Sequence, residues 1–337
     1  MLAVADKIPE ISGVDPRALP EEVLAATRPV VLRGLVASWP VARAGMESGR
    51  SADAYLRRFY RDATVNAMLG APAIEGRFFY NDDLNGFNFR PVRIKLDTVL
   101  DEIARHEDVA TPPAIYVGST TIDTCLPGFR AENDLNFGGR EPLASVWIGN
   151  RTRIAAHFDL PDNIACVVAG HRRFTLFPPE QLANLYVGPL DLTPAGQAIS
   201  LVDFAHPDFQ RVPRVAEALR HGQVAELAPG DALFIPSMWW HHIEALDTFN
   251  VLVNYWWRSS PRWMDTPMNA LMLAIMTLRD LPPEQRKAWQ NHFQHYVFEA
   301  GEQTSGHIPE PARRTLAPLS SDLARELRAR LLQNLNR

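Results

Sequence analysis

A dense series of short apolar segments between residues 143 and 257 constrains the fold of this chain more than any other feature. Eight segments follow one another and are separated by Pro, Gly, Asp or Asn: LASVWIG, TRIAAHFD, NIACVVAG, RRFTLF, QVAEL, DALFIP, HHIEAL and FNVLVNYWW. Short strands with turn residues between them are typical of a barrel or a double-sheet jelly roll, and not of a parallel α/β sheet. We therefore predict a mainly β fold to which helices are added.

The sequence before residue 143 has a mixed pattern. We expect an α/β segment over residues 1–142 that packs on a barrel core formed by residues 143–263. Strand-like runs here are 29–35, 63–69, 77–80 and 114–118, and helix-spaced apolar residues occupy 51–61 and 96–106.

Residues 264–337 are predicted to be helical. The pair Thr266-Pro267 is a good helix start, because a capping side chain precedes a proline in the first turn. Apolar residues then recur at helical spacing through 268–276, and further helices are expected after Pro283 and near the C-terminus. Two interpretations stay open: these apolar stripes pack on the barrel, or they pair with a second subunit to form a homodimer.

The composition narrows the classes of partner and compartment. The net charge is −5 and no basic block is present, which argues against nucleic acid and against an anionic membrane surface. The two cysteines, Cys125 and Cys166, have no metal-type spacing, so neither a disulfide framework nor a cysteine metal site is expected. The N-terminus lacks the apolar run of a signal peptide, and no apolar stretch is long enough to span a bilayer. We expect a soluble, cytoplasmic protein.

A metal-binding pattern lies inside the strand-dense region. His157 and Asp159 stand two residues apart in a predicted strand, so both side chains point to the same face. The third ligand should come from a later strand, where His241 and His242 follow two tryptophans. Strand alternation sends these two histidines to opposite faces, so only one of them can reach the ion. Two imidazoles and one carboxylate leave coordination positions open, which suits iron(II) oxygenase chemistry.

Three blocks of sequence around these residues resemble a known family. They are AAHFDLPDNIACVVAGHRRFTLFPP at 155–179, PGDALFIPSMWWHHIEAL at 229–246 and NVLVNYWW at 250–257. Over about residues 29–257 the chain is similar to the JmjC-related, cupin-like 2-oxoglutarate oxygenases, especially the branch of the asparaginyl hydroxylase that acts on hypoxia-inducible factor. The resemblance implies a double-stranded β-helix in which His157, Asp159 and His241 bind iron(II) and act as the catalytic residues.

The resemblance also implies a site for 2-oxoglutarate. The family's lysine for the distal carboxylate falls on Arg172, whose guanidinium can pair with a carboxylate through two hydrogen bonds. Three further residues at family-like positions are expected to bind the cofactor or co-substrate: Asn163, Asn254 and Trp256. Ile154 stands where the family often has a threonine whose hydroxyl contacts 2-oxoglutarate. That hydrogen bond is either missing here or supplied by Tyr80, Tyr116 or Arg153.

The activity implied by the resemblance is hydroxylation of a C–H bond in a protein side chain or a small molecule, with O₂ consumed and succinate and CO₂ released. Two other functions remain open on the sequence. Ile154 and Arg172 would suit a metal-bound cupin that has lost oxygenase activity and serves as a binding or regulatory module. A zinc or manganese sugar isomerase on the same barrel would work without oxygen.

Overall fold

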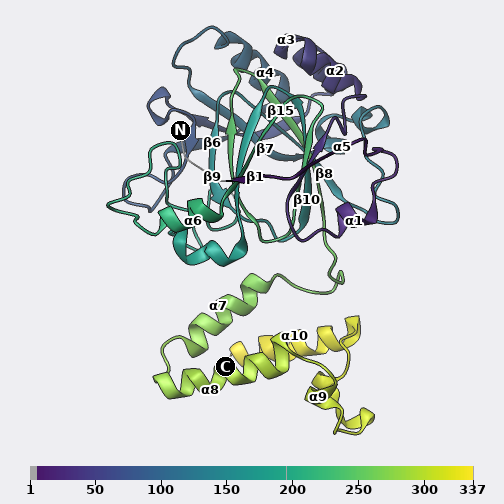
Figure 1. The fold of residues 1–337 in the computed structure, drawn as a ribbon, viewed down its shortest axis with the longest axis vertical. Helices are drawn as coiled ribbons and strands as arrows, with labels where there is room; N and C mark the ends of the chain where they lie inside the picture. Colours follow the sequence, from purple (N-terminus) through teal and green to yellow (C-terminus); the bar gives the residue numbers. More distant parts are fainter. Residues whose placement is uncertain (1–5, 195, 337) are drawn as a thin grey trace. The chain divides into compact units, whose positions relative to one another are not determined.

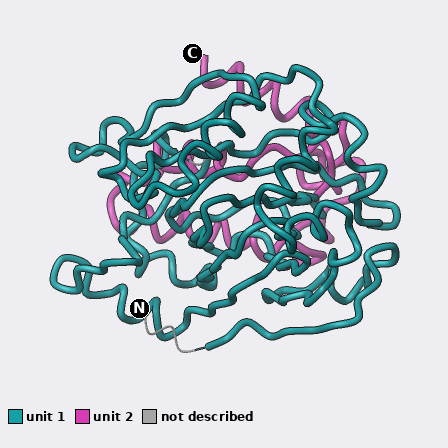
Figure 2. The backbone as a smooth tube through the Cα atoms, turned by 90° about the horizontal axis from the view of Figure 1, so that it is seen from above, with its two compact units in different colours: residues 1–259 teal, residues 260–337 magenta. Residues whose placement is uncertain are grey.

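The computed structural model describes residues 6–194 and 196–336. The chain divides into two compact units, Met1–Ser259 and Ser260–Arg337 (Figure 1, Figure 2). The first unit consists of β-sheets with helices on their surface, and the second is helical. The dividing point lies a few residues before Trp263, where the sequence pattern placed the end of the barrel core.

Eight strands of the first unit form the two sheets of a jelly roll. A six-stranded sheet contains β9 (Arg153–His157), β11 (Arg172–Phe177), β12 (Gln223–Leu227) and β14 (Trp240–Ala245). A nine-stranded sheet contains β8 (Leu143–Gly149), β10 (Asp162–Ala169), β13 (Ala232–Ile235) and β15 (Asn250–Trp257). The chain passes repeatedly between the sheets, and the pairings among these strands are antiparallel. The predicted fold class is therefore confirmed, and each predicted run contains one strand.

The N-terminal part extends both sheets. Two short strands lie at the edges of the six-stranded sheet: β1 (Asp6–Lys7) and β5 (Arg77–Phe78). Five belong to the nine-stranded sheet: β2 (Glu10–Ser12), β3 (Val30–Arg33), β4 (Thr64–Gly70), β6 (Phe89–Lys95) and β7 (Ala114–Thr121). Strands β3, β4, β5 and β7 confirm the four strand-like runs expected before residue 143.

Helices of the first unit cover part of this framework (Figure 1). They are α1 (Glu21–Leu24), α2 (Pro40–Glu47), α3 (Gly49–Arg57), α4 (Leu96–Arg105), α5 (Ile122–Cys125) and α6 (Val215–His221). The sequence of α4 shows why it docks: Leu96, Val99, Leu100 and Ile103 recur at helical spacing and are all buried. They join a core cluster that includes residues of the nine-stranded sheet.

Strand β10 runs through the centre of the core, and its two faces meet different clusters. Ile164 and Cys166 belong to the cluster beneath the helices. Ala165 and Val167 belong instead to the cluster between the two sheets, together with Phe174 of β11. A strand that is buried on both faces needs apolar residues at successive positions, which explains the unbroken apolar run of this segment.

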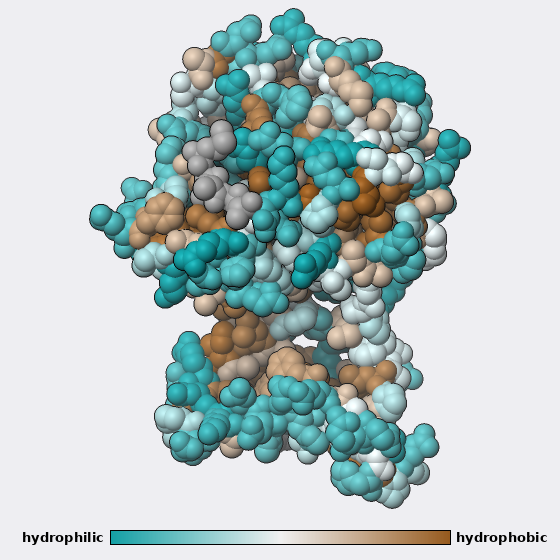
Figure 3. All heavy atoms as spheres, viewed as in Figure 1, coloured by the Kyte–Doolittle hydropathy of each residue, from teal (hydrophilic) through white to brown (hydrophobic). Residues whose placement is uncertain are grey.

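The second unit contains α7 (Pro267–Leu278), α8 (Pro283–Phe293), α9 (Glu302–Ser305) and α10 (Ser321–Leu335). The Thr266 hydroxyl accepts a hydrogen bond from the backbone N–H of Met268 at 3.4 Å, so the predicted helix start is confirmed. The apolar stripe of α7 is exposed, with Leu271 at 46% and Met276 at 66% of full exposure. Apolar patches beside hydrophilic surface are visible on this unit in Figure 3. No helix in the described part of the chain is long and apolar enough to cross a membrane.

Candidate metal centre

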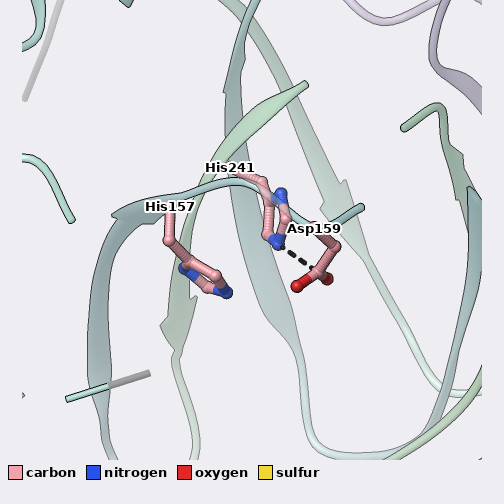
Figure 4. A group of neighbouring side chains, drawn as sticks. All are labelled: His157, Asp159 and His241. Atoms are coloured by element: carbon pink, nitrogen blue, oxygen red, sulfur yellow. Dashed lines mark ion pairs between the residues drawn. The ribbon is translucent and has the colours of Figure 1, made fainter. Parts of the chain in front are cut away.

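Three predicted ligands come together at one end of the barrel: His157, Asp159 and His241. Their potential ligand atoms all lie within 4.8 Å of one another, and the three side chains are turned toward one another (Figure 4). His157 is the last residue of β9, and strand pairing sets it directly opposite His241 of the neighbouring β14. The Nε2 atom of His241 lies 3.6 Å from Oδ2 of Asp159.

Asp159 reaches this cluster from a position that differs from the predicted one. The strand expected to continue through Asp159 ends at His157, so Asp159 belongs to the following loop. Its backbone carbonyl accepts a hydrogen bond from the N–H of Met238 at 2.9 Å, which ties the loop to the segment that enters β14. A loop contact, and not strand alternation, thus holds the residue whose carboxylate faces the two histidines.

The imidazole rings of His157 and His241 are oriented by their own backbone. Nδ1 of His157 lies 3.0 Å from the carbonyl oxygen of Ala155, and Nδ1 of His241 lies 2.9 Å from that of Trp239. A carbonyl oxygen only accepts, so in each ring Nδ1 carries a proton and Nε2 is the nitrogen available to a metal. Burial, with repulsion from His241, lowers the pKa of His157 to about 4, so this ring is neutral at pH 7.

The carboxylate of Asp159 is held in its ionised form. Burial by itself would raise the pKa of this group, but the nearby His241 and His157 and the indole of Trp256 together lower it below the usual value. The indole nitrogen of Trp256 donates to Oδ2 of Asp159 at 3.2 Å. Two imidazole nitrogens and one oriented carboxylate are a donor set that fits a divalent transition metal.

His242 lies on the other face of β14, as alternation requires. Its Nδ1 lies 2.7 Å from the carbonyl oxygen of Ile154, and its ring packs against Phe204 with the ring centres 5.1 Å apart. Burial lowers the pKa of His242 to about 4. The ambiguity between the two adjacent histidines is thereby resolved in geometry, because His241 alone faces the cluster with His157 and Asp159.

The three residues open into a cavity of about 450 Å³ between the two sheets. Arg172 of β11 lines the same cavity and is only 2% exposed. Its Nε atom is buried without a hydrogen-bond partner, and no carboxylate in the described part of the chain forms an ion pair with it. Burial lowers the pKa of Arg172 to about 10, which leaves the guanidinium charged at pH 7. An uncompensated buried cation is costly, so the cavity suits an anionic ligand.

The other predicted cofactor-binding residues also line this cavity: Asn163, Asn254 and Trp256. Of the three side chains considered as substitutes for the threonine replaced by Ile154, Tyr116 lies in the cavity wall. Tyr80 donates instead to the carbonyl oxygen of Leu192 at 2.5 Å. Arg153 points to the outer side of its sheet and contacts Asp203 at 3.3 Å.

A family model described as "Cupin-like domain" matches residues 16–262, which is most of the chain. The chain belongs to this family. The resemblance to the JmjC-related, cupin-like oxygenases is thereby confirmed at the level of the family. The matched region includes strands β3 to β15 and the residues of the candidate metal site and cavity described above.

Several curated proteins are similar to parts of this cupin-like chain. HSPB1-associated protein 1 of Bos taurus is 31% identical over 47% of the chain and 33% of its own length. Lysine-specific demethylase JMJ31 of Arabidopsis thaliana is 33% identical over 37% of the chain and 24% of its own length. tRNA wybutosine-synthesizing protein 5 of Danio rerio is 37% identical over 31% of the chain and 29% of its own length. The chain therefore spans only about a quarter to a third of these relatives.

Sequence reasoning did not single out Trp147 of β8, which forms part of the cavity wall in this cupin-like domain. Its indole nitrogen donates to Oδ1 of Asn254 at 2.7 Å. Strand alternation in the LASVWIG run could have identified the inward face that carries it. The hydrogen bond itself depends on the register between β8 and β15, which no local pattern reveals.

Proposed function

We propose that this protein is an iron(II)- and 2-oxoglutarate-dependent oxygenase that hydroxylates a C–H bond of a protein side chain or a small molecule. Membership of the cupin-like family supports an oxygenase of the JmjC kind. One observation supports the use of iron and 2-oxoglutarate in particular. The three potential metal ligands His157, Asp159 and His241 line the same cavity as the Arg172 cation, which has no ion-pair partner among the described residues.

In this proposal His157 and His241 hold iron(II) through Nε2, and Asp159 holds it through its carboxylate. Two imidazoles and one carboxylate occupy only part of the coordination sphere, so room remains for further ligands. Bound iron supplies the activation of O₂. The chain contributes pre-oriented imidazoles, because the carbonyl oxygens of Ala155 and Trp239 hold their Nδ1–H groups.

Arg172 is proposed to bind the distal carboxylate of 2-oxoglutarate. A guanidinium pairs with a carboxylate through two parallel hydrogen bonds, and the pair is strong where water is excluded. The wall around it is formed largely by apolar and aromatic side chains, including Phe174, Ile235 and Leu252. These side chains keep bulk water away from the carboxylate and from the reacting C–H bond.

The overall reaction consumes one substrate C–H bond, O₂ and 2-oxoglutarate. One oxygen atom enters the new C–OH group, the other enters the carboxylate of succinate, and CO₂ leaves from the 2-oxoglutarate carboxyl. The relatives include proteins named as lysine-specific demethylases and a tRNA wybutosine-synthesizing protein, so their names indicate different substrate classes. The proposal for this chain therefore specifies a C–H bond and no particular substrate.

Iron-dependent formation of succinate from 2-oxoglutarate tests this proposal. We expect the wild-type protein to form succinate and Asp159→Ala to lose at least about 100-fold of the rate, because the carboxylate ligand is removed. Asp83→Ala is the matched control, since Asp83 is an exposed loop residue. Undiminished succinate formation by Asp159→Ala would refute the assignment. A metal-bound cupin without oxygenase activity would show no turnover and no 2-oxoglutarate binding in any variant.

A further inference from the structure

A chain of hydrogen bonds crosses three adjacent strands on the cavity wall. Strands β8, β15 and β10 are neighbours in the nine-stranded sheet, and they contribute Trp147, Asn254 and Asn163 respectively. The Trp147 indole nitrogen donates to Oδ1 of Asn254 at 2.7 Å, and Nδ2 of Asn254 donates to Oδ1 of Asn163 at 3.2 Å. Both asparagines are almost fully buried, at 1% and 6% exposure.

The indole of Trp147 fixes the donor-to-acceptor direction of these hydrogen bonds. An asparagine amide can turn over and exchange its oxygen and nitrogen, but an indole N–H is a donor only. Trp147 therefore requires the oxygen of Asn254 to face it, which turns the Asn254 nitrogen toward Asn163. The oxygen of Asn163 must then accept. Its Nδ2 makes no hydrogen bond to any residue of the described ranges and is left for the cavity that Asn163 lines.

If these hydrogen bonds ran in the opposite direction, Asn163 would present its carbonyl oxygen to the cavity in place of its N–H group. Without the indole N–H, Asn254 could turn over and accept from Asn163 Nδ2, and the Asn163 oxygen would then face the cavity. A carbonyl oxygen repels a carboxylate or keto oxygen, whereas an N–H group binds it. The same cavity holds the guanidinium of Arg172, so an N–H group on Asn163 adds a second donor for an anionic ligand.

We propose that Trp147 is a positioning residue that sets the polarity of this hydrogen-bond chain, so that Asn163 offers an N–H donor to an oxygen of 2-oxoglutarate. The inference rests on the proposed use of 2-oxoglutarate and adds a residue that acts through Asn254 and Asn163. This role accounts for the position of Trp147, whose indole can only donate, next to the two buried amides of Asn254 and Asn163. The two hydrogen bonds also satisfy both amide oxygens and leave the Asn163 N–H for the cavity.

Binding of 2-oxoglutarate to the iron(II)-loaded protein, measured by calorimetry without oxygen, tests this role. We expect Trp147→Phe to weaken the affinity about fivefold, because one neutral hydrogen bond to the ligand is lost or inverted. Its iron content should match that of the wild type, since no metal ligand belongs to the chain of hydrogen bonds. Trp39→Phe is the matched control, because Trp39 is a buried indole in the core cluster beneath the helices. That variant should keep the wild-type affinity.

An affinity of Trp147→Phe equal to that of the wild type would overturn the inference. If the wild type itself binds no 2-oxoglutarate, the proposed function fails, and that outcome is distinct from a selective result on Trp147. Should Trp147→Phe not fold, side-chain amide NMR of the wild type with zinc in place of iron gives an independent answer. The Asn163 amide signals, assigned by their loss in Asn163→Asp, should shift downfield on addition of 2-oxoglutarate. Unchanged signals would overturn the inference.

Discussion

The two faces of the six-stranded sheet carry the same residue types with different surroundings. On strand β11, Arg172 faces the cavity and has no ion-pair partner among the described residues, whereas Arg173 faces outward and pairs with Glu226 at 2.7 Å. On strand β14, His241 joins the metal cluster, whereas His242 faces the opposite side. Adjacent residues of identical type thus have different surroundings, because successive residues of a strand face opposite sides of the sheet.

The two faces also differ in how the charge of their arginine is balanced. On the outer face, the charge of Arg173 is balanced by two glutamates. On the inner face, the Arg172 cation has no such partner among the described residues and lies in the cavity that His157 and His241 also line. The Nε2 atom of His242 on the outer face is also buried without a hydrogen-bond partner, so it is the unbalanced charge of Arg172 that distinguishes the cavity side of the sheet.

The largest predicted difference lies between the two histidines. His241→Ala should weaken iron binding by more than about 100-fold, because it removes a ligand. His242→Phe should keep the iron content of the wild type and lower the free energy of unfolding by about 1 kcal/mol, since one hydrogen bond to the Ile154 carbonyl is lost. Metal analysis after dialysis and urea unfolding measure the two effects. Equal loss of iron in both variants would contradict the prediction that His241, and not His242, binds the metal.

The two arginines should differ next. Arg172→Met is expected to weaken 2-oxoglutarate binding by about 100-fold, because a charge-assisted pair with a carboxylate is lost. The ligand-free variant should be no less stable than the wild type, since an uncompensated buried charge is removed. Arg173→Met should change the affinity less than about twofold, because Arg173 faces away from the cavity and pairs with Glu226. Calorimetric titration and thermal unfolding provide both readouts, and an equal effect of the two substitutions would contradict the account.

The helical unit should affect assembly and leave catalysis unchanged. Its exposed apolar residues on α7 lead us to predict a homodimer formed through these helices. Leu271→Glu combined with Met276→Glu should give a monomer with unchanged activity per chain. Asn269→Glu, a substitution at an exposed polar position of the same helix, is the control. Light scattering after size exclusion measures the mass. A monomeric wild type, or a double variant that remains dimeric, would refute this prediction.

Most strands and the five longest helices could be predicted because their patterns are local, whereas shorter helices such as α2 and α6 were missed. The apolar stripe of α4 and the eight runs of the barrel each match one element. Two features of the site could not be predicted, because they depend on contacts between segments that are distant in the sequence. Asp159 lies beyond the end of β9, where a contact with Met238 from a distant segment holds it. The bond between Trp147 and Asn254 depends on the pairing of β8 with β15.

The choice between His241 and His242 illustrates the same limit. Alternation alone states that the two point in opposite directions, but it does not state which one faces the cavity. That answer depends on the register that sets His241 opposite His157, a contact between strands far apart in the sequence. Family resemblance supplied the assignment before the geometry did.

Calorimetric titration of the iron(II)-loaded wild-type protein with 2-oxoglutarate, in the absence of oxygen, tests the central claim most directly. We predict one saturable site per chain that disappears when the metal is removed and is strongly weakened in Arg172→Met. Absence of binding to the iron-loaded protein, or binding that is the same with and without the metal and the Arg172 guanidinium, would contradict the account.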